Sequence, residues 1–216
     1  MNQDRQLQEA VLAEFLWEPS VNASHIGVTA DQGIISLTGH VSSYFEKQAA
    51  EKAAARVKGV KAVTQEIEVR LPSEAERSDE NIARAALDRI AWEALVPAAD
   101  IKVKIEDGWI TLSGEVEWRY QHDYTENVIR GLRGVMGITN NLTIKPRVNV
   151  PNIVRDIGTA LKRSWFEPST IRVSADRGKV TLTGTVESLS DKWMAATTAW
   201  GSPGTMGVEN NLVVIA

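Results

Sequence analysis

Apolar and polar residues alternate in three stretches of the chain that resemble one another. Each stretch is bounded by glycines and is followed by a valine. The stretches are Gly33-Ile-Ile-Ser-Leu-Thr-Gly39 with Val41, Gly108-Trp-Ile-Thr-Leu-Ser-Gly114 with Val116, and Gly178-Lys-Val-Thr-Leu-Thr-Gly184 with Val186. Alternation with a period of two is typical of a strand that buries one face. The pattern therefore predicts three copies of one small domain.

The copies are regularly spaced. Gly33, Gly108 and Gly178 are 75 and 70 residues apart. A period near 70 is too long for a solenoid unit, and it fits tandem domains close to the smallest size that folds alone. We expect the domains to span residues 1–71, 77–146 and 148–216.

Each copy opens with a helix whose apolar residues recur every four positions. The expected buried stripes are Leu7, Val11 and Phe15, then Ile82, Ala86 and Ile90, and then Ile153, Ile157 and Leu161. A short alternating strand follows each helix. The next turn ends in glycine after an aspartate, and this composition suits the positive φ angles of a tight hairpin.

A second helix follows the glycine-bounded strand in each copy. Ser43 and Glu46 have the spacing of a capping box. The expected buried stripes are Phe45, Ala49, Ala53 and Val57, then Tyr120, Tyr124, Val128 and Leu132, and then Met194 and Thr198 beside the added Trp193 and Trp200. A last strand is expected over residues 63–69, 138–144 and 208–214.

The predicted fold class is α+β, with three tandem small domains in the order helix–strand–strand–helix–strand. A hairpin makes the first two strands antiparallel, and a right-handed crossover makes the third parallel to the second. Each domain is then a three-stranded mixed sheet covered on one face by two helices. Gly39, Gly114 and Gly184 are expected on the inward face, where the missing side chain lets a helix pack close.

This order of elements and its motifs resemble the BON domain, a family named for bacterial osmotically inducible and nodulation proteins. Gly39, Gly114 and Gly184 match the most characteristic glycine of the family. Asn140-Asn141-Leu142 and Asn210-Asn211-Leu212 match its ending, whereas the first copy departs with Gln65-Glu66-Ile67. The resemblance covers nearly the whole chain. It implies a binding module associated with phospholipid or envelope interaction and with osmotic or other stress.

Composition limits the partners. The chain has 216 residues, no cysteine and a formal charge of −4, which excludes disulfides and argues against nucleic-acid binding. Residues 148–216 carry 7 basic and 6 acidic side chains and would repel an anionic surface least. The N-terminus resembles an amphipathic helix, and no run has the length of a transmembrane segment. We expect a cytoplasmic location; a periplasmic one would require that a signal peptide had been removed.

Catalytic apparatus is not expected. His25, His40 and His122 form no metal-ligand motif, and no phosphate-binding or nucleophile motif is present. We expect no cofactor, no metal and no enzymatic activity. Gln65, Asn140 and Asn210 should point toward the apolar face and need partners there. We expect these partners in the loop after the glycine-bounded strand, with a ligand contact as the alternative.

The tryptophans indicate where a partner would bind. Trp17, Trp92 and Trp165 recur at the end of the first helix, so a shared structural role is expected there. Trp109 and Trp118 are expected to point outward, and exposed tryptophans favour interfaces. In the third copy, five residues could join aromatic and basic character as a lipid surface requires, or could equally pack against a neighbouring domain: Lys162, Arg163, Trp165, Phe166 and Lys192.

These residues suggest a non-enzymatic binding module. The first hypothesis is association with an anionic phospholipid surface under osmotic or other stress. The alternative is a protein–protein or self-assembling module that binds a partner, or a second copy, through its exposed tryptophans.

Overall fold

The three copies, called domains 1, 2 and 3, all have the predicted order of elements. The computed structural model describes residues 3–145, 152–163 and 170–215. Domain 1 comprises α1 (Gln3–Leu16), β1 (Ile26–Asp31), β2 (Ile34–Val41), α2 (Tyr44–Arg56) and β3 (Ala62–Val69). Domain 2 comprises α3 (Asp79–Trp92), β4 (Ile101–Glu106), β5 (Trp109–Val116), α4 (Arg119–Ile129) and β6 (Gly137–Ile144). Domain 3 comprises α5 (Ile153–Leu161), β7 (Ile171–Asp176), β8 (Lys179–Val186), α6 (Leu189–Trp200) and β9 (Gly207–Val214).

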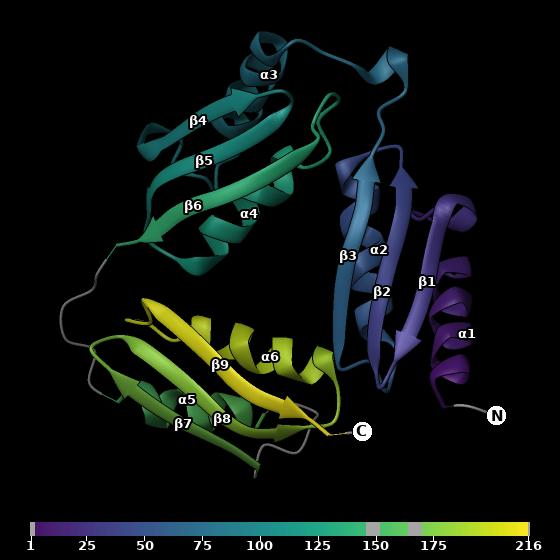
Figure 1. The fold of residues 1–216 in the computed structure, drawn as a ribbon. Helices are drawn as coiled ribbons and strands as arrows, with labels where there is room; N and C mark the ends of the chain where they lie inside the picture. Colours follow the sequence, from purple (N-terminus) through teal and green to yellow (C-terminus); the bar gives the residue numbers. More distant parts are fainter. Residues whose placement is uncertain (1–2, 146–151, 164–169, 216) are drawn as a thin grey trace.

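Each domain contains the mixed sheet that the sequence predicts. The strand orders are β1-β2-β3, β4-β5-β6 and β7-β8-β9. The middle strand pairs antiparallel with the first strand and parallel with the third. In the hairpin of domain 2, Asp107 and Gly108 have φ angles of 50° and 75°, as a turn with two positive φ angles requires. Figure 1 shows both helices of each domain on one face of its sheet.

The cores are built from the predicted strand residues and the predicted stripes of the first helices. Ile35 and Leu37 of β2 are fully buried, as are Ile110 and Leu112 of β5. On the first helices, the buried residues are Val11, Phe15, Ile82, Ala86, Ile90, Ile153, Ile157 and Leu161. Period-two and period-four patterns therefore located the core on these elements correctly.

The buried face of each second helix is shifted by about one residue from the prediction, although Ala53 is buried as predicted and the other predicted positions that pack partly buried against the cores are Ala49, Val57, Tyr124, Val128 and Leu132. On α2 the fully buried residues include Ala50, Ala53 and Ala54, whereas the side chain of Phe45 is 38% exposed. The buried positions of α4 are Thr125 and Ile129, and those of α6 include Ala195 and Ala199. One residue turns a helix by about 100°. Small residues therefore face the sheet on α2 and α6, while Ile129 does so on α4. Three large residues predicted to be buried are exposed: Phe45, Tyr120 and Met194.

The capping box at the start of α2 is confirmed in part. Ser43 Oγ accepts a hydrogen bond from the Glu46 amide at 3.2 Å. The Glu46 carboxylate does not bond back to the Ser43 amide. It accepts from the amides of Ser42 at 3.0 Å and Asn22 at 2.8 Å. The buried carboxylate thus ties the start of α2 to the segment before β1.

The recurring glycine of the middle strand meets backbone, not a helix. Gly39, Gly114 and Gly184 have φ angles of 110°, 134° and 123°, a region that side chains other than hydrogen rarely allow. A Cβ atom on Gly114 would overlap the carbonyl oxygen of Asp100, the residue before β4. The corresponding partners of the other two glycines are His25 and Thr170. The expectation that a helix packs against these glycines was wrong.

The inward amides of the third strands bond to the second helices. Gln65 Nε2 donates to the carbonyl oxygen of Lys47 at 3.1 Å. Asn140 Nδ2 donates to His122 O at 3.0 Å, and Asn210 Nδ2 donates to Lys192 O at 2.7 Å. The partners are helical carbonyls rather than the loop that the sequence suggested. Each bond satisfies an inward amide and fixes the helix against the strand that follows it.

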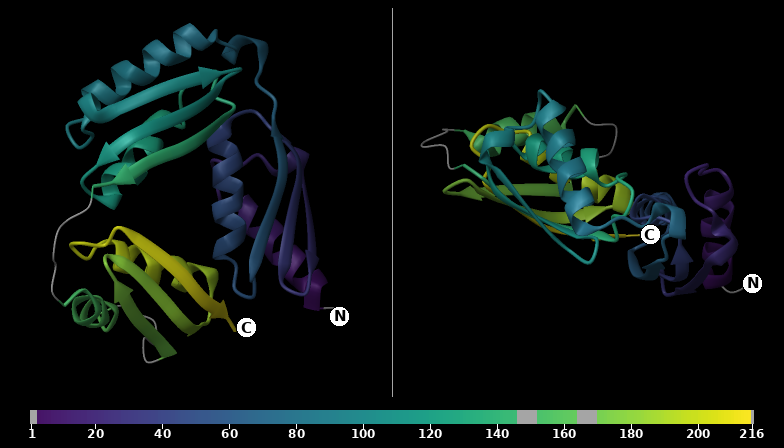
Figure 2. Two further views of the ribbon diagram at one scale, coloured as in Figure 1. Left: turned by 60° about the vertical axis from the view of Figure 1, so that its left-hand side comes forward. Right: turned by 90° about the horizontal axis from the view of Figure 1, so that it is seen from above.

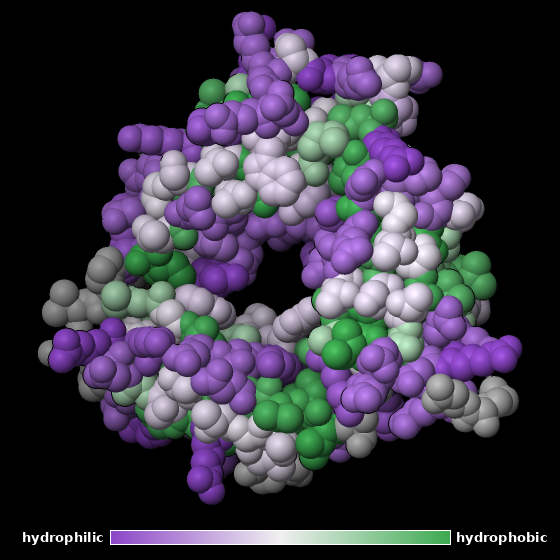
Figure 3. All heavy atoms as spheres, viewed as in Figure 1, coloured by the Kyte–Doolittle hydropathy of each residue, from purple (hydrophilic) through white to green (hydrophobic). Residues whose placement is uncertain are grey.

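The three second helices join the domains into a closed ring. The first residue of each helix contacts another domain: Tyr44 packs against the core of domain 2, Arg119 lies over Trp200 of domain 3, and Leu189 packs against the core of domain 1. Each domain therefore gives one such contact and receives one, which is a head-to-tail arrangement that closes. Figures 1 and 2 show three separate sheets around a centre, and Figure 3 shows an opening between them.

Polar groups fill the interface between domains 1 and 2. Gln48 Nε2 donates to Tyr44 Oη at 2.7 Å and to Glu126 Oε1 at 3.0 Å. The guanidinium of Arg130 lies 5.1 Å from the centre of the Phe45 ring. Burial raises the pKa of Tyr44, and the negative charge of Glu126 adds to this effect. Polar and aromatic side chains of α2 and α4 thus find their binding partners in each other at this junction.

A substitution at Gly114 tests the backbone contact. Gly114→Ala should lower the free energy of unfolding by about 2–4 kcal/mol, because the methyl group overlaps Asp100 and the residue is held at positive φ. Urea unfolding followed by circular dichroism measures the change. Gly131→Ala is the control, since a Cβ atom there has no neighbour within 4 Å. If the two variants were equally stable, the close contact between Gly114 and the backbone of Asp100 would be contradicted.

Candidate functional site

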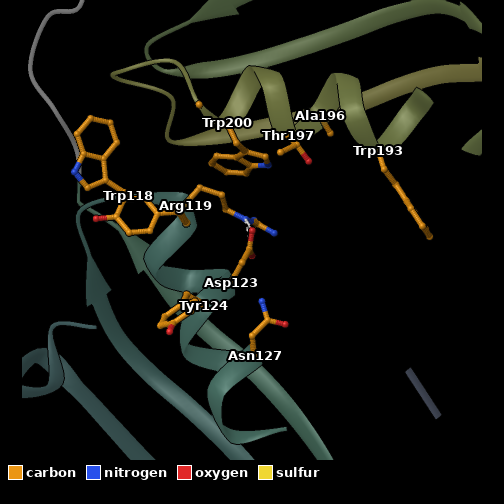
Figure 4. A pocket seen from close by; sticks show the side chains of 11 residues that line it. Trp118, Arg119, Asp123, Tyr124, Asn127, Trp193, Ala196, Thr197 and Trp200 are labelled. Atoms are coloured by element: carbon orange, nitrogen blue, oxygen red, sulfur yellow. Dashed lines mark hydrogen bonds and ion pairs between the residues drawn. The ribbon is translucent and has the colours of Figure 1, made fainter. Parts of the chain in front are cut away.

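An apolar-lined cleft lies between α4 of domain 2 and α6 of domain 3. Its volume is about 790 Å³. Domain 2 contributes Trp118, Arg119, Tyr120, Asp123, Tyr124 and Asn127, and domain 3 contributes Trp193, Ala196, Thr197, Trp200 and Gly201. Figure 4 shows Trp200, Arg119 and Asp123 between the two helices, with Trp193 at one end and Trp118 at the other. Three of the seven tryptophans of the chain therefore line one cleft.

Local sequence explains why each helix presents its side chains there. Trp118 is the N-cap of α4, and Gln121 Oε1 accepts from the amides of Glu117 at 2.9 Å and Trp118 at 3.0 Å. On α6, Ser188 Oγ accepts from the Asp191 amide at 3.0 Å. Trp193 and Trp200 are seven residues apart, which is about two helical turns, so they share one face. The buried alanines of α6 lie on a different face.

The cleft is lined by an ion pair within α4, and the arginine of this pair also contacts domain 3. Arg119 Nε donates to the carboxylate of Asp123 at 2.9 Å. The same guanidinium lies 4.7 Å from the centre of the Trp200 ring. A cation–π contact of this kind contributes about 0.5–2 kcal/mol, depending on its exposure. Asp123 therefore holds Arg119 in the position from which it contacts domain 3, as Figure 4 shows.

The charge of Asp123 is stabilised within the site. Burial acts to raise the pKa of Asp123, but hydrogen bonds from His122 and Arg119 outweigh it and lower the pKa overall. His122 Nδ1 lies 2.8 Å from Asp123 Oδ1. Because the folded-state pKa is depressed, the pairing is fully present above the ordinary aspartate pKa of about 3.9 and is lost as pH falls through the lowered value. The Arg119–Asp123 pair thus persists at neutral pH.

The predicted contact residues do not gather at one place. Trp118 lines the cleft, whereas Trp109 lies on the other face of its domain. Trp109 Nε1 donates to Thr139 Oγ1 at 2.9 Å, and its ring covers Gly137, so this tryptophan packs on its own sheet although 48% of it is exposed. Trp165 and Phe166 lie outside the residues that the structure describes.

The basic residues predicted in domain 3 come from the ends of its two helices. Lys162 and Arg163 follow α5 and are exposed, and Lys192 lies half-buried in the first turn of α6. Within the described residues, none of the three side chains makes an ion pair. Lys162 and Arg163 therefore present free positive charge at the C-terminal end of α5.

The tryptophans at the ends of the first helices are exposed rather than structural. Trp17 and Trp92 are both 85% exposed, and Leu16 beside Trp17 is 82% exposed. The expected shared structural role was wrong for these two positions. The third, Trp165, is outside the described residues. The same corner is therefore exposed and apolar in two domains.

The three histidines make local contacts. The rings of His25 and His40 pack together with centres 4.6 Å apart, and His122 bonds to Asp123. Among the described residues, no group of three or more His, Cys, Asp or Glu side chains could hold a metal ion. No helix in that part of the chain has both the length and the apolar composition to cross a bilayer.

Sequence reasoning missed most of the cleft. Arg119, Asp123 and Asn127 carried no signal, because their pattern is that of an ordinary exposed helix face. Trp193 and Trp200 did carry one, because their spacing of seven residues places two large aromatic side chains on one face of a helix. Domain 3 already had its core residues at other positions of α6, so this second stripe indicated a contact outside the domain.

The fold and the cleft together define a protein made of three tandem helix–strand modules whose second helices form the contacts between modules. The chain belongs to the BON domain family: the family model matches residues 3–70, 78–146 and 149–216. A relative is Osmotically-inducible protein Y of Escherichia coli (strain K12), which is 27% identical over 146 residues, covering 66% of this chain and 73% of that protein. The cytoplasmic location expected from the N-terminal sequence gains no support from this relative.

Two solved structures share only a distant likeness. One is the C-terminal domain of CdsD, the structural protein of the type III secretion system of Chlamydia trachomatis, with 16% identity, a TM-score of 0.28 and 100% of both chains covered. A second structure of CdsD has 17% identity and a TM-score of 0.27, with 97% of this chain and 92% of that chain covered. TM-scores this low carry no argument about function.

Removing the guanidinium of Arg119 should separate domains 2 and 3. Arg119→Ala eliminates both the contact with Trp200 and the pair with Asp123, so the ring should open and the radius of gyration should rise in small-angle X-ray scattering. The matched control is Arg84→Ala, which breaks an exposed pair with Glu80 on α3. An unchanged scattering curve for Arg119→Ala would show that other contacts hold this junction.

Proposed function

We propose that this protein is a non-enzymatic binding protein of a stress response that attaches to phospholipid membrane surfaces. The observation that carries the proposal is the exposure of Leu16 and Trp17 at the end of α1 and of Trp92 at the same corner of domain 2. Large apolar side chains that remain in water contribute nothing to folding, and tryptophan favours the interface between lipid and water. Osmotic induction, named for the Escherichia coli relative, supports the link to stress.

Unpaired positive charge determines which domain an anionic surface attracts. In domain 1, Arg56 is held by Glu14 and Glu18, both at 2.9 Å, so its positive charge is already neutralised. In domain 3, Lys162 and Arg163 are exposed beside the end of α5. A basic residue near an anionic membrane contributes about 1 kcal/mol. We expect domain 1 to supply apolar contact and domain 3 to supply electrostatic attraction.

The arrangement of polar groups supports a binding role rather than catalysis. The one His–Asp contact in the described residues, between His122 and Asp123, shares its carboxylate with Arg119. Asn140 bonds to the carbonyl oxygen of His122 from the neighbouring strand. Groups held in this way stabilise the junction of two domains. We therefore assign no reacting group.

Vesicle flotation tests the proposal. The full chain should float with vesicles that contain about a third anionic phospholipid at low salt. The double variant Leu16→Ala, Trp17→Ala should bind about tenfold less, because two exposed apolar side chains no longer reach the bilayer. Lys162→Glu with Arg163→Glu should lose binding to anionic vesicles and its dependence on salt.

Trp109→Ala is the control for the loss of a tryptophan outside the exposed corner. It should float like the unchanged protein, because Trp109 packs on its own sheet. Absence of the unchanged protein from the floated fraction at low salt would reject membrane attachment. The same corner would then serve the alternative, a protein partner or a second copy of the chain, which light scattering over a range of concentrations detects as a rise in mass.

A further inference from the structure

We propose that the hairpin turn of domain 1 binds a phosphate group through two backbone amides, with two lysines beside them. The amides are those of Gln32 and Gly33, and the lysines are Lys58 and Lys61. Three observations support this site: the equivalent turn of domain 2 binds a carboxylate, the turn glycine of domain 1 is buried, and domain 1 has a lysine where the other domains have methionine.

The equivalent turn of domain 2 holds a carboxylate of the same chain. The amide of Asp107 donates to Asp79 Oδ2 at 2.9 Å, and the amide of Gly108 donates to Asp79 Oδ1 at 2.8 Å. Both turn residues have positive φ angles, 50° and 75°. Successive N–H groups that point to one side of the backbone form a concavity that binds anions. In this protein, such a turn therefore binds two oxygens of one anion.

The turn of domain 1 has the same backbone conformation in a different environment. Gln32 and Gly33 have φ angles of 50° and 87°. Within the described residues, no acceptor bonds to either amide. Gly33 is nevertheless buried, and buried N–H groups in proteins are nearly always hydrogen-bonded. An anion from outside the chain would supply the acceptors that Asp79 supplies in domain 2.

Asp4 is the counterpart of Asp79 but does not bond to the turn. Asp4 and Asp79 are 75 positions apart, as are Gly33 and Gly108. Asp4 lines the pocket beside the turn, and in the described chain no hydrogen bond joins its carboxylate to either turn amide. Its negative charge opposes an incoming anion. Removal of this charge should therefore strengthen the binding of phosphate.

Lys61 places a cation where the other two domains have an apolar residue. A Cβ atom on Gly33 would lie 3.0 Å from Lys61 Cδ. In domains 2 and 3, the side chains that lie at the corresponding glycines are Met136 and Met206. Neither Lys61 nor Lys58 forms an ion pair with another described residue. Both positive charges are therefore available to a ligand at the turn.

The pocket around the turn has the size and charge for a phosphate group. Its volume is about 440 Å³, within the range of roughly 300–1,000 Å³ that small-ligand sites occupy. Its charged lining residues are Asp4, Lys58 and Lys61, so positive charge is in excess. The two amides take two oxygens of the ligand. A phosphate group has a further oxygen and a further negative charge for the lysines, whereas a carboxylate has neither.

This site is separate from the apolar corner of domain 1. The pocket lies at the start of α1, and Leu16 and Trp17 lie at its end. A helix of this length spans about 20 Å at 1.5 Å per residue. Failure of the full chain to float with vesicles would therefore reject membrane attachment without affecting the binding of soluble phosphate.

Titration of the isotope-labelled full chain with inorganic phosphate tests the proposal. Amide NMR spectra are recorded at constant ionic strength up to about 20 mM phosphate, where a complex with a Kd of about 1 mM is almost fully formed. The signals of Gln32 and Gly33 should shift saturably. Those of Asp107 and Gly108 should not, because Asp79 already bonds to them. The turn of domain 2 is thus an internal control in the same sample.

Three variants separate the contributions of charge. Lys61→Met introduces the residue of the other two domains and should weaken phosphate binding by about fivefold or more. Asp4→Asn should strengthen binding by about threefold, because a like charge is removed. Lys102→Met is the matched control, since Lys102 is exposed on β4 and lies outside the pocket. This variant should bind phosphate as the unchanged protein does.

Glycerol phosphate and vesicles that contain phosphatidic acid distinguish two sources of the phosphate group. A soluble phosphate ester is indicated if glycerol phosphate shifts the same two amides and Lys61→Met floats like the unchanged protein. A lipid headgroup is indicated if Lys61→Met reduces flotation with these vesicles.

The proposal is overturned if inorganic phosphate shifts neither Gln32 nor Gly33, or if it shifts the turn of domain 2 equally. It is also overturned if Lys61→Met binds phosphate as strongly as the unchanged protein. Acetate, which has only two oxygens, should shift the two amides less than phosphate at the same concentration, and equal shifts would overturn the choice of phosphate.

Discussion

The arrangement of the whole chain depends on which face each second helix turns to its own sheet. On α2 and α6 small residues occupy that face, as Ala50, Ala53 and Ala54 do on α2, and on α4 Thr125 and Ile129 occupy it. Small side chains let a helix approach its sheet closely, and tight packing of this kind supplies much of the stability of a small domain. Once the small residues face inward, the large residues next to them must face outward. Those outward residues make the contacts between domains and line the cleft.

The strands and the first helices could be predicted because their apolar patterns are compatible with only one buried face. Ile35 and Leu37 alternate with polar neighbours, and a shift by one residue would expose the whole apolar set. The stripe of Val11 and Phe15 is similarly unambiguous. The family fold followed from the same positions. Sequence patterns thus determined the architecture of one domain almost completely.

The second helices were misread because size was taken as a sign of burial. Phe45 and Tyr120 looked like core residues, while the alanines and Thr125 that fill the core carried a weaker signal. The glycine of the middle strand was misread for a related reason: its neighbour is a carbonyl group, and a pattern of side chains says nothing about backbone. The cleft depends on residues about 70–80 positions apart in sequence, such as Arg119 and Trp200. A local sequence pattern does not determine how two folded domains pack against each other.

The closed ring has a consequence for how such a chain could change its length. In an open array of tandem domains, a copy can be gained or lost at either end with the loss of one junction. Here the N-terminal end of α6 contacts domain 1, so the first and last copies are also neighbours. Deleting any domain would break two junctions and expose helix faces on both survivors. Each of the three domains therefore owes its place in the ring to both of the others.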